Sequence, residues 1–407
     1  MFGPGHRQWT PSSPPLADFL PPGPLEARLA EAARARSDEP YLQLLAGRRL
    51  FVQVPHGRTD HGRTDGEDRP PGPDLLHTRG TDRALPLWTR GTLPPAEPGH
   101  VFLSRDCAGL FGQLRGGRIV VAPETPAERR LTATPENHRT LLRLERERPH
   151  LDGGCHGHTG ALLHRSSWPV HGVLAQSLAL GAHIAVHNGL PWNELGDCWH
   201  GYEEDRELLR ESWGVHSPEG WRKAVDDLLD RHGGDRATEV ALVARLRAVA
   251  CGSRPRDVDV WDEQLGLVCL EAGLPPEALD QLRARARRVA RYEARFRADG
   301  LLPADGFVTS VRGYDYGRAV NMARWGLAAR YTDRAAAEEA VLRAGRMARN
   351  RYTSWAAFSA GYVLGRVLRF DDEEFGEWYR HGLGPHRVLT GDPASPWRSL
   401  DWRLPAR

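Results

Sequence analysis

The sequence predicts an α+β protein in which a small mixed α/β N-terminal domain precedes a mainly α-helical C-terminal domain. At 407 residues the chain exceeds the usual size of one domain, so two are expected. Before residue 149, short apolar segments of strand character alternate with helical segments, which is typical of a mixed domain. From residue 172 onward, apolar residues recur almost continuously at helical spacing.

Composition gives the domain boundaries. Residues 1–24 are rich in Pro, Gly and Ser, and we expect them to form a disordered arm. The α/β domain is expected over residues 25–149. Residues 150–171 are rich in Gly, His and Ser and have no sustained period, which indicates a linker. The helical domain is expected over residues 172–407.

In the first domain, strands are indicated by apolar and β-branched runs such as RRLFVQV and GGRIVVAPET. Helices are indicated by apolar residues three and four positions apart. Ser104 is expected to be the N-cap of the second helix, because its hydroxyl can accept from an unpaired backbone N–H. The expected elements are, in order, a helix over 25–36, strands over 48–54, 84–90 and 100–103, a helix over 104–114, a strand within 116–125 and a helix over 135–147.

In the second domain, one continuous apolar helix is expected over 172–188, ending at Gly189. Ser217 followed by Pro218 predicts an N-cap and the first position of another helix. The remaining helices are expected over 203–215, 218–232, 237–250, 263–272 and 276–298, followed by two or three packed helices within 312–367.

The charge balance predicts no general attraction to nucleic acid or to an anionic membrane, because 55 basic and 53 acidic residues leave a formal charge of +2. Lys223 is the only lysine, which indicates an arginine-rich composition from a GC-rich genome. Ala224 follows it, so the chain has no phosphate loop of the GxxxxGK[ST] type. The enzyme motifs GxSxG, HExxH and GxGxxG after a strand are absent as well.

Cysteine usage and hydropathy predict a cytoplasmic protein. The five cysteines are odd in number and widely spaced, and no CxxC occurs, so a disulfide framework is not expected. The first residues lack the continuous apolar stretch of a secretory signal. No apolar run approaches the ~20 residues that a membrane-spanning helix needs.

A few polar residues in the C-terminal helices form the candidate ligand-binding set. Asp315 and Arg318 lie at i and i+3, so they share a helix face and can pair. Arg366, on a helix that begins near Ser354, is expected to reach Asp315 across the helix interface. Two interpretations stay open: a buried polar clasp that fixes the register of two helices, or a pocket for a carboxylate or phosphate. The full candidate set is Asp315, Arg318, Asn321, Trp355 and Arg366.

Small residues and tryptophans predict close packing in the same region. Ala357, Gly361 and Gly365 are four positions apart, so they share a face on which another backbone can approach closely. Glycine inside a helix costs about 1 kcal/mol relative to alanine, which indicates a packing need. Trp397 and Trp402, in SPWRSLDW, are expected to fix the C-terminal tail onto the helices.

One cluster contains residue types that bind zinc. Cys155 and His158 could supply two ligands, and Cys198 and His200 two more. Their irregular spacing in a glycine-rich setting instead favours a polar linker, so no metal and no cofactor is expected.

The helix over 276–298 carries apolar residues on one face and arginines on the other. We expect Leu282, Val289 and Phe296 to be buried and the arginine face to be solvated. An exposed arginine face continuous with other basic surface would instead indicate nucleic-acid binding. The balanced net charge favours the solvated face.

The first domain resembles the N-terminal domain of the SseB (enhanced serine sensitivity) family. The similar segments are RRLFVQV, LPLWTR and VVAPETPAERRL, within about a hundred residues. The resemblance implies a binding or scaffolding domain, linked to secretion by the family's name, and carries over no catalytic residue.

The second domain resembles the family known as domain of unknown function 1266. The similarity covers roughly residues 173–403 and includes YDYGRAVNMARWGL, with its Asp315 and Arg318. It implies a helical bacterial domain of unassigned biochemistry. The other similar segments are LALGAHIAVHNGLPW, RELLRESWGVHSPEGWRKAVDDLL, YTSWAAFSAGYVLGR and SPWRSLDW.

Together these features predict a non-enzymatic module that binds a protein partner or a ligand. A link to secretion, toxin immunity or stress rests on the SseB resemblance alone. One alternative is an enzyme or small-anion binder with a pocket at Asp315, Arg318 and Arg366. Another is nucleic-acid binding through the arginine-rich segment 276–297. A closed, fully paired cluster with an apolar patch elsewhere favours a protein partner, and a deep pocket favours ligand chemistry. The oligomeric state stays open.

Overall fold

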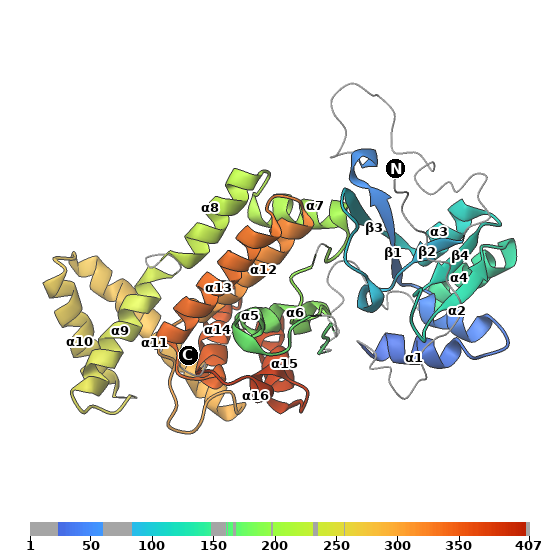
Figure 1. The fold of residues 1–407 in the computed structure, drawn as a ribbon. Helices are drawn as coiled ribbons and strands as arrows, with labels where there is room; N and C mark the ends of the chain where they lie inside the picture. The colour runs from blue at the N-terminus through green and yellow to red at the C-terminus, as the bar shows by residue number, and fades with distance from the viewer. Residues whose placement is uncertain are drawn as a thin grey trace. The chain divides into compact units, whose positions relative to one another are not determined.

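The computed structural model confirms the predicted fold class, with small sheets and short helices followed by a mainly helical region (Figure 1). The chain divides into two compact units, Met1–Cys155 and His156–Arg407, here called unit 1 and unit 2. Most of the expected arm 1–24, and much of the expected linker 150–171, lie outside the described residues. The structure describes residues 23–59, 84–147, 160, 162–165, 168–196, 198–230, 235–255 and 257–403.

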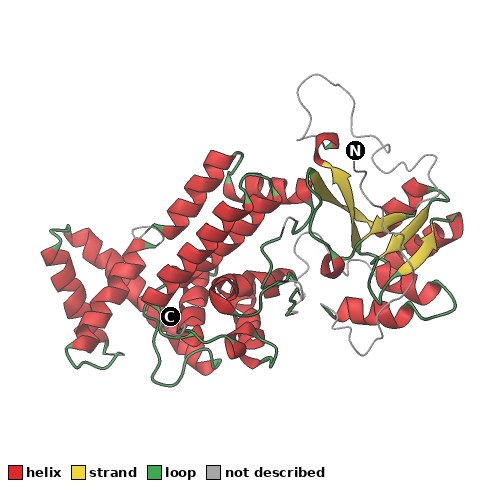
Figure 2. Cartoon of the chain, in the orientation of Figure 1, coloured by secondary structure: helices red, strands yellow, loops and turns green. Residues whose placement is uncertain are grey.

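The described part of unit 1 contains two small sheets (Figure 2). In the first, β1 (Arg49–Pro55) pairs antiparallel with β3 (His100–Asp106). In the second, β2 (Leu85–Leu87) is parallel to β4 (Arg118–Val121), and β5 (Arg129–Thr132) is antiparallel to β4. The expected strands are therefore present, and β5 is an addition that the sequence did not predict.

The helices of unit 1 are amphipathic and short. Three follow the expected positions, and α2 was not predicted because its seven residues are too few to establish a period. Among the described residues of unit 1, the four α-helices are α1 (Pro24–Ala32), α2 (Glu39–Leu45), α3 (Cys107–Leu114) and α4 (Pro135–Glu147).

The prediction that Ser104 caps a helix is wrong. Ser104 lies inside β3 opposite Phe51, and its hydroxyl accepts a hydrogen bond from Arg49 Nε at 2.6 Å. The cap of α3 is Asp106, whose carboxylate accepts from the Gly109 N–H at 2.5 Å. Pairing with β1 extends the strand by three residues beyond its apolar segment, which moves the start of the helix.

Unit 2 is a helical assembly. Its elements are α5 (Gly172–Leu178), the 3₁₀ helix η6 (Ala179–Gly181), α6 (Ala182–Asn188), α7 (Tyr202–Trp213), α8 (Pro218–Leu229), α9 (Arg236–Ala250), α10 (Val258–Glu271), α11 (Pro276–Ala298), α12 (Arg312–Ala328), α13 (Arg334–Arg351), α14 (Trp355–Phe370), α15 (Glu377–Gly391) and α16 (Pro396–Ser399). The predicted cap of α8 is confirmed, since Ser217 Oγ accepts from the Gly220 N–H at 3.1 Å. Helix α10 begins earlier than predicted because Asp257 caps it.

The prediction of one continuous helix over 172–188 is wrong, because η6 interrupts it between α5 and α6. At this point the backbone packs closely against α12. A Cβ on Gly181 would lie 2.7 Å from Arg324 and 2.8 Å from Val320. The end of α6 follows the prediction, since Gly189 closes it in the left-handed conformation, with φ of 63°.

Helix α12 lies at the centre of unit 2. It packs against α6, α7, α8, α13, α14 and η6. Every residue of α12 except Arg318 is buried. A helix that is buried all round must satisfy its polar side chains inside the protein, and this requirement shapes the candidate site.

The glycines of α14 allow another backbone to approach closely, as predicted. A Cβ on Gly361 would overlap the Ser310 carbonyl oxygen and the Tyr352 hydroxyl. A Cβ on Gly365 would lie 2.8 Å from Val311 O. The backbone preceding α12 therefore contacts α14 directly.

The C-terminal tail is fixed onto the helices, which confirms the prediction for its two tryptophans. Trp397 Nε1 donates to Ala179 O at 3.1 Å, and Trp402 Nε1 donates to Tyr352 O at 2.8 Å. Gln176 Nε2 adds donations to the carbonyls of the tail, including Trp402 O at 2.7 Å. None of the helices in the described part of the chain combines the length and apolar character needed to cross a bilayer.

We expect Gly361→Ala to destabilise the protein by about 1–3 kcal/mol, because the new methyl group overpacks a closed interface. Gly384→Ala on α15 is the matched control. Its Cβ would meet nothing within 4 Å, so the substitution should stabilise by up to about 1 kcal/mol. Urea unfolding of the full chain measures both, and equal effects would contradict the packing argument.

Candidate functional site

The predicted pair of Asp315 and Arg318 is present on α12, and a second arginine joins it. Arg318 donates to Asp315 Oδ1, and Arg312 Nη1 donates to Asp315 Oδ2 at 2.6 Å. Arg312 Nη2 also donates to Leu228 O at 2.9 Å and to Asp230 O at 2.5 Å. Arg312 is 1% exposed, so its charge is held entirely by acceptors of this chain.

Aromatic rings surround the outer arginine of this cluster. The Arg318 guanidinium lies 4.3 Å from the Tyr314 ring centroid and 5.6 Å from that of Trp213. Its Nε is buried without a hydrogen-bond acceptor among the described residues. Contact with a ring face offsets part of the desolvation of a guanidinium.

Asn321 belongs to a second group, centred on Arg324. The Asn321 Oδ1 accepts from Arg324 Nη1 at 3.2 Å, and its Nδ2 donates to Gly317 O at 2.8 Å. Arg324 is fully buried and donates to Glu194 O at 2.9 Å and to Trp192 O. This group joins the segment between α6 and α7 to α12.

Trp355 and Arg366 lie apart from Asp315. Trp355 Nε1 donates to Leu400 O at 2.7 Å, and its ring stacks on Trp397 with centroids 5.4 Å apart. The Arg366 guanidinium lies 5.3 Å from the Trp378 ring centroid. Within the described residues, Arg366 makes no ion pair with Asp315. The structure therefore divides the predicted set among four places.

A buried serine between two histidines was not predicted. Ser359 Oγ on α14 lies 3.0 Å from His183 Nε2 on α6 and 2.8 Å from His386 Nδ1 on α15. His183 also stacks on Tyr362, with centroids 4.1 Å apart, and meets the edge of Trp397. All three polar residues are buried, so this row joins α6, α14 and α15.

Both histidines are held neutral by their surroundings. Burial lowers the pKa of His183 well below 6.5, and His386, Arg366 and His187 lower it further. Burial, with a smaller contribution from Arg387, lowers the pKa of His386 to about 4. The hydrogen-bonded row thus consists of uncharged groups at neutral pH.

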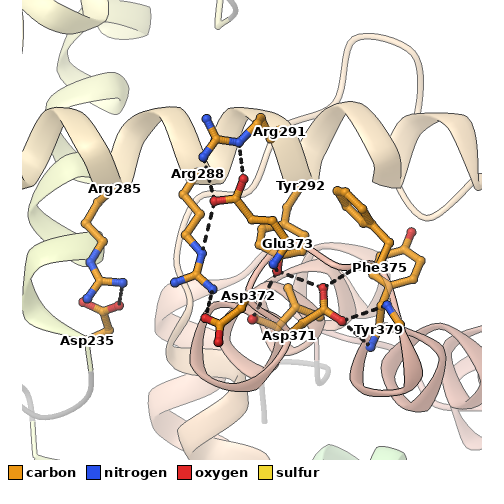
Figure 3. A network of polar contacts seen from close by, with 12 residues as sticks. Asp235, Arg285, Arg288, Arg291, Tyr292, Asp371, Asp372, Glu373, Phe375 and Tyr379 are labelled. Atoms are coloured by element: carbon orange, nitrogen blue, oxygen red, sulfur yellow. Dashed lines mark hydrogen bonds and ion pairs between the residues drawn. The ribbon is translucent and has the colours of Figure 1, made fainter.

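The arginine face of α11 is largely paired with carboxylates of this chain (Figure 3). The acidic run 371–374, which follows α14, supplies partners for two of these arginines. The Arg291 guanidinium lowers the pKa of Glu373 through hydrogen bonding. The ion pairs are Arg283 with Asp262, Arg285 with Asp235, Arg288 with Asp372, Arg291 with Glu373, and Arg295 with Asp299.

The loop that carries this acidic run is fixed by Asp371. Its carboxylate accepts from Tyr292 Oη at 2.9 Å and from the backbone N–H groups of Phe375, Gly376 and Tyr379 (Figure 3). The opposite charges of the acidic run and the arginine face are the sequence signal for this pairing. Local sequence patterns do not connect the two segments, because the paired residues are 84 and 82 positions apart.

The zinc candidates are only partly described. Cys155 and His158 lie outside the described residues. Cys198 is buried, and the Nδ1 of His200 is hydrogen-bonded to Asp205 at 2.9 Å. Across the described ranges, no group of three or more His, Cys, Asp or Glu residues is arranged to hold a metal ion.

Helix α10 has apolar residues on both sides. Trp261, Leu265 and Cys269 are buried against α9 and α11. Leu267 and Leu270 point to solvent and are 47% and 79% exposed. Leu274, just beyond the helix end, is 43% exposed, and we call Leu267, Leu270 and Leu274 the α10 apolar face. An apolar stripe on the outer side of a helix is typical of a surface that another molecule covers.

The helices under α10 are held together by buried polar contacts. Arg245 of α9 and Glu293 of α11 form a buried bidentate pair, at 2.8 and 2.7 Å. The Arg245 guanidinium also lies 4.4 Å from the Trp261 ring centroid of α10. Because α9, α10 and α11 share this cluster, Leu267 and Leu270 of the α10 apolar face are presented by packed helices.

One comparison with known proteins gives a match. Residues 208–402 match the family described as "Protein of unknown function (DUF1266)". This confirms the expected resemblance of the C-terminal region, which includes Asp315, Arg366 and the α10 apolar face. No curated protein and no solved structure matches the chain. The resemblance of the first domain to the SseB family stays a prediction.

We expect Asp315→Ala to destabilise the protein by about 3–5 kcal/mol, because it leaves the Arg312 charge buried without its carboxylate. The control is Asp227→Ala, which breaks an exposed pair with Lys223 and should cost less than about 1 kcal/mol. Chemical denaturation measures both. A small effect at Asp315 would show that Arg312 does not depend on the carboxylate.

The neutral histidines predict a loss of stability in mild acid. Between pH 6.5 and about 4, the unfolded chain binds a proton at His386 that the folded chain does not, so stability falls as the pH drops through this window. His386→Asn keeps a polar group at the Nδ1 position and removes the titration. From pH 7 to pH 5, the unchanged protein should lose about 2 kcal/mol more stability than this variant. Parallel pH profiles would contradict the assignment.

Proposed function

We propose that this protein is a non-enzymatic interaction module that binds a protein partner through the α10 apolar face. The observation that carries the proposal is the exposure of Leu267 and Leu270 on a helix whose opposite side already packs into unit 2, with Leu274 exposed just beyond its end. Large exposed apolar side chains on a rigid surface favour a protein contact, since burying each one is worth about 1.5–3 kcal/mol.

The Asp315 cluster supports this choice over a small-anion site. Both oxygens of Asp315 accept from guanidinium groups of its own helix, and Arg312 also donates to two carbonyls. An anion at this position would compete with the carboxylate and carbonyl acceptors for the same donors. The cluster therefore favours a structural clasp.

The pairing of α11 favours a protein partner over nucleic acid. Five of its arginines form ion pairs with carboxylates of this chain, which reduces the positive charge available for phosphates. Nucleic-acid binding through this face would have to displace the 371–374 carboxylates first.

We also propose a cytoplasmic setting, in which unit 1 serves as a scaffolding domain. The free thiols Cys107, Cys198, Cys251 and Cys269 support a reducing compartment. The resemblance of residues 25–149 to the SseB family supports the scaffolding role and a connection to secretion, toxin immunity or stress.

Photo-crosslinking in the native cells tests the proposed surface. With p-benzoylphenylalanine in place of Leu270, we expect a discrete crosslinked protein species. The matched control carries the probe at Glu339 of α13, whose side chain is 63% exposed. The same crosslinked species at both positions, or none at Leu270, would overturn the proposal.

A further inference from the structure

We propose that the partner presents a basic amphipathic helix, which lies along α10 with its apolar side on Leu267, Leu270 and Leu274. This inference rests on the proposed function and names the class of partner. It follows from the acidic charge of the segment that carries the α10 apolar face and from the helical spacing of Leu267 and Leu270.

The segment around the α10 apolar face is acidic throughout. Residues 257–280 contain seven Asp or Glu and no Lys or Arg, in a chain with 55 basic residues. Asp262 and Asp280 pair with Arg283, and Glu271 pairs with Arg247. The others are not neutralised in this way. Among the described residues no ion pair involves Asp257, Asp259, Glu263 or Glu277.

Two of these carboxylates lie on α10 itself. Asp259 and Glu263 are one helical turn apart and exposed, and Glu263 precedes Leu267 by another turn. A partner that buries the leucines therefore brings its flanking side chains close to negative charge. Lys or Arg at those positions would be favourable, and Asp or Glu would be repelled.

The geometry suits a helix. Leu267 and Leu270 are three positions apart on α10, whereas Leu274 follows Gly273, whose left-handed φ of 59° lies beyond the end of the helix. A facing helix with apolar residues at i and i+3 or i+4 matches the spacing of Leu267 and Leu270. The buried Arg245 and Glu293 pair keeps the supporting helices in place, so binding needs little rearrangement.

The charges disfavour a second copy of this chain at the same face. Symmetric pairing of two α10 helices would place Asp259 and Glu263 of both copies against like charge. Arg283, the arginine of α11 that pairs with α10, is already engaged by Asp262 within the chain. An anionic membrane is disfavoured for the same reason.

The test uses two synthetic helical peptides of about 18 residues, a length at which an isolated helix begins to be stable. Both carry Leu at i, i+3 and i+7, flanked by Lys in one peptide and by Glu in the other. Fluorescence anisotropy with the full chain should show that the Lys peptide binds. The affinity for the Glu peptide should be lower by roughly tenfold or more.

Variants then assign the binding to α10. Leu270→Ser should lower the affinity of the protein for the Lys peptide by roughly tenfold or more. The double variant Asp259→Lys, Glu263→Lys should reverse the preference between the two peptides. The matched control makes the same charge change one turn apart on α7, at Glu207 and Glu211, which are 58% and 64% exposed. This control should leave both affinities unchanged.

The outcomes separate this inference from the proposed function. The basic-helix inference is overturned if the two peptides bind with equal affinity, or if Leu270→Ser leaves the affinity for the Lys peptide unchanged. If crosslinking at Leu270 still captures a discrete protein in cells, the interaction surface stands and only the partner class is wrong. If the crosslink is absent as well, the proposed function fails too.

Discussion

The arrangement of unit 2 depends on how α12 satisfies its buried charges. Arg312 and Arg324 are almost fully excluded from water, and an unpaired charge in that position would be worth several kcal/mol of destabilisation. Each arginine therefore takes acceptors from outside α12. Arg312 takes the carbonyl of Leu228 at the end of α8, and Arg324 takes that of Trp192 before α7. The two guanidiniums thereby fix the position of both segments against the central helix.

Because the buried arginines of α12 are held by interior acceptors, the polar residues around them stabilise the fold. The polar groups that look functional in the sequence, such as Asp315, are engaged in holding helices together. The row of Ser359 and its two histidines does the same between α6, α14 and α15. Among the exposed large apolar side chains of the described residues, Leu270 of α10 is the most exposed, at 79%, which is why we propose this helix as the binding surface.

Much of the fold could be predicted because local signals decide it. Ser217 and Pro218 begin α8 as expected, and the glycines of α14 pack closely as their spacing indicates. Contacts between distant segments decided the rest. Pairing with β1 kept Ser104 in a strand, and packing against Arg324 of α12 broke the helix at η6.

The candidate site shows the same limit. The spacing of Asp315 and Arg318 predicted their pairing, but nothing local indicates that Arg312 joins them or that Arg366 lies elsewhere. The pattern of charges along the sequence also indicates contacts between distant segments. The basic face of α11 finds its match in the acidic run 371–374, whereas residues 257–280 keep acidic side chains beside exposed leucines. A chain with a net charge of only +2 thus retains an acidic segment at α10, and we propose that its partner supplies the opposite charge.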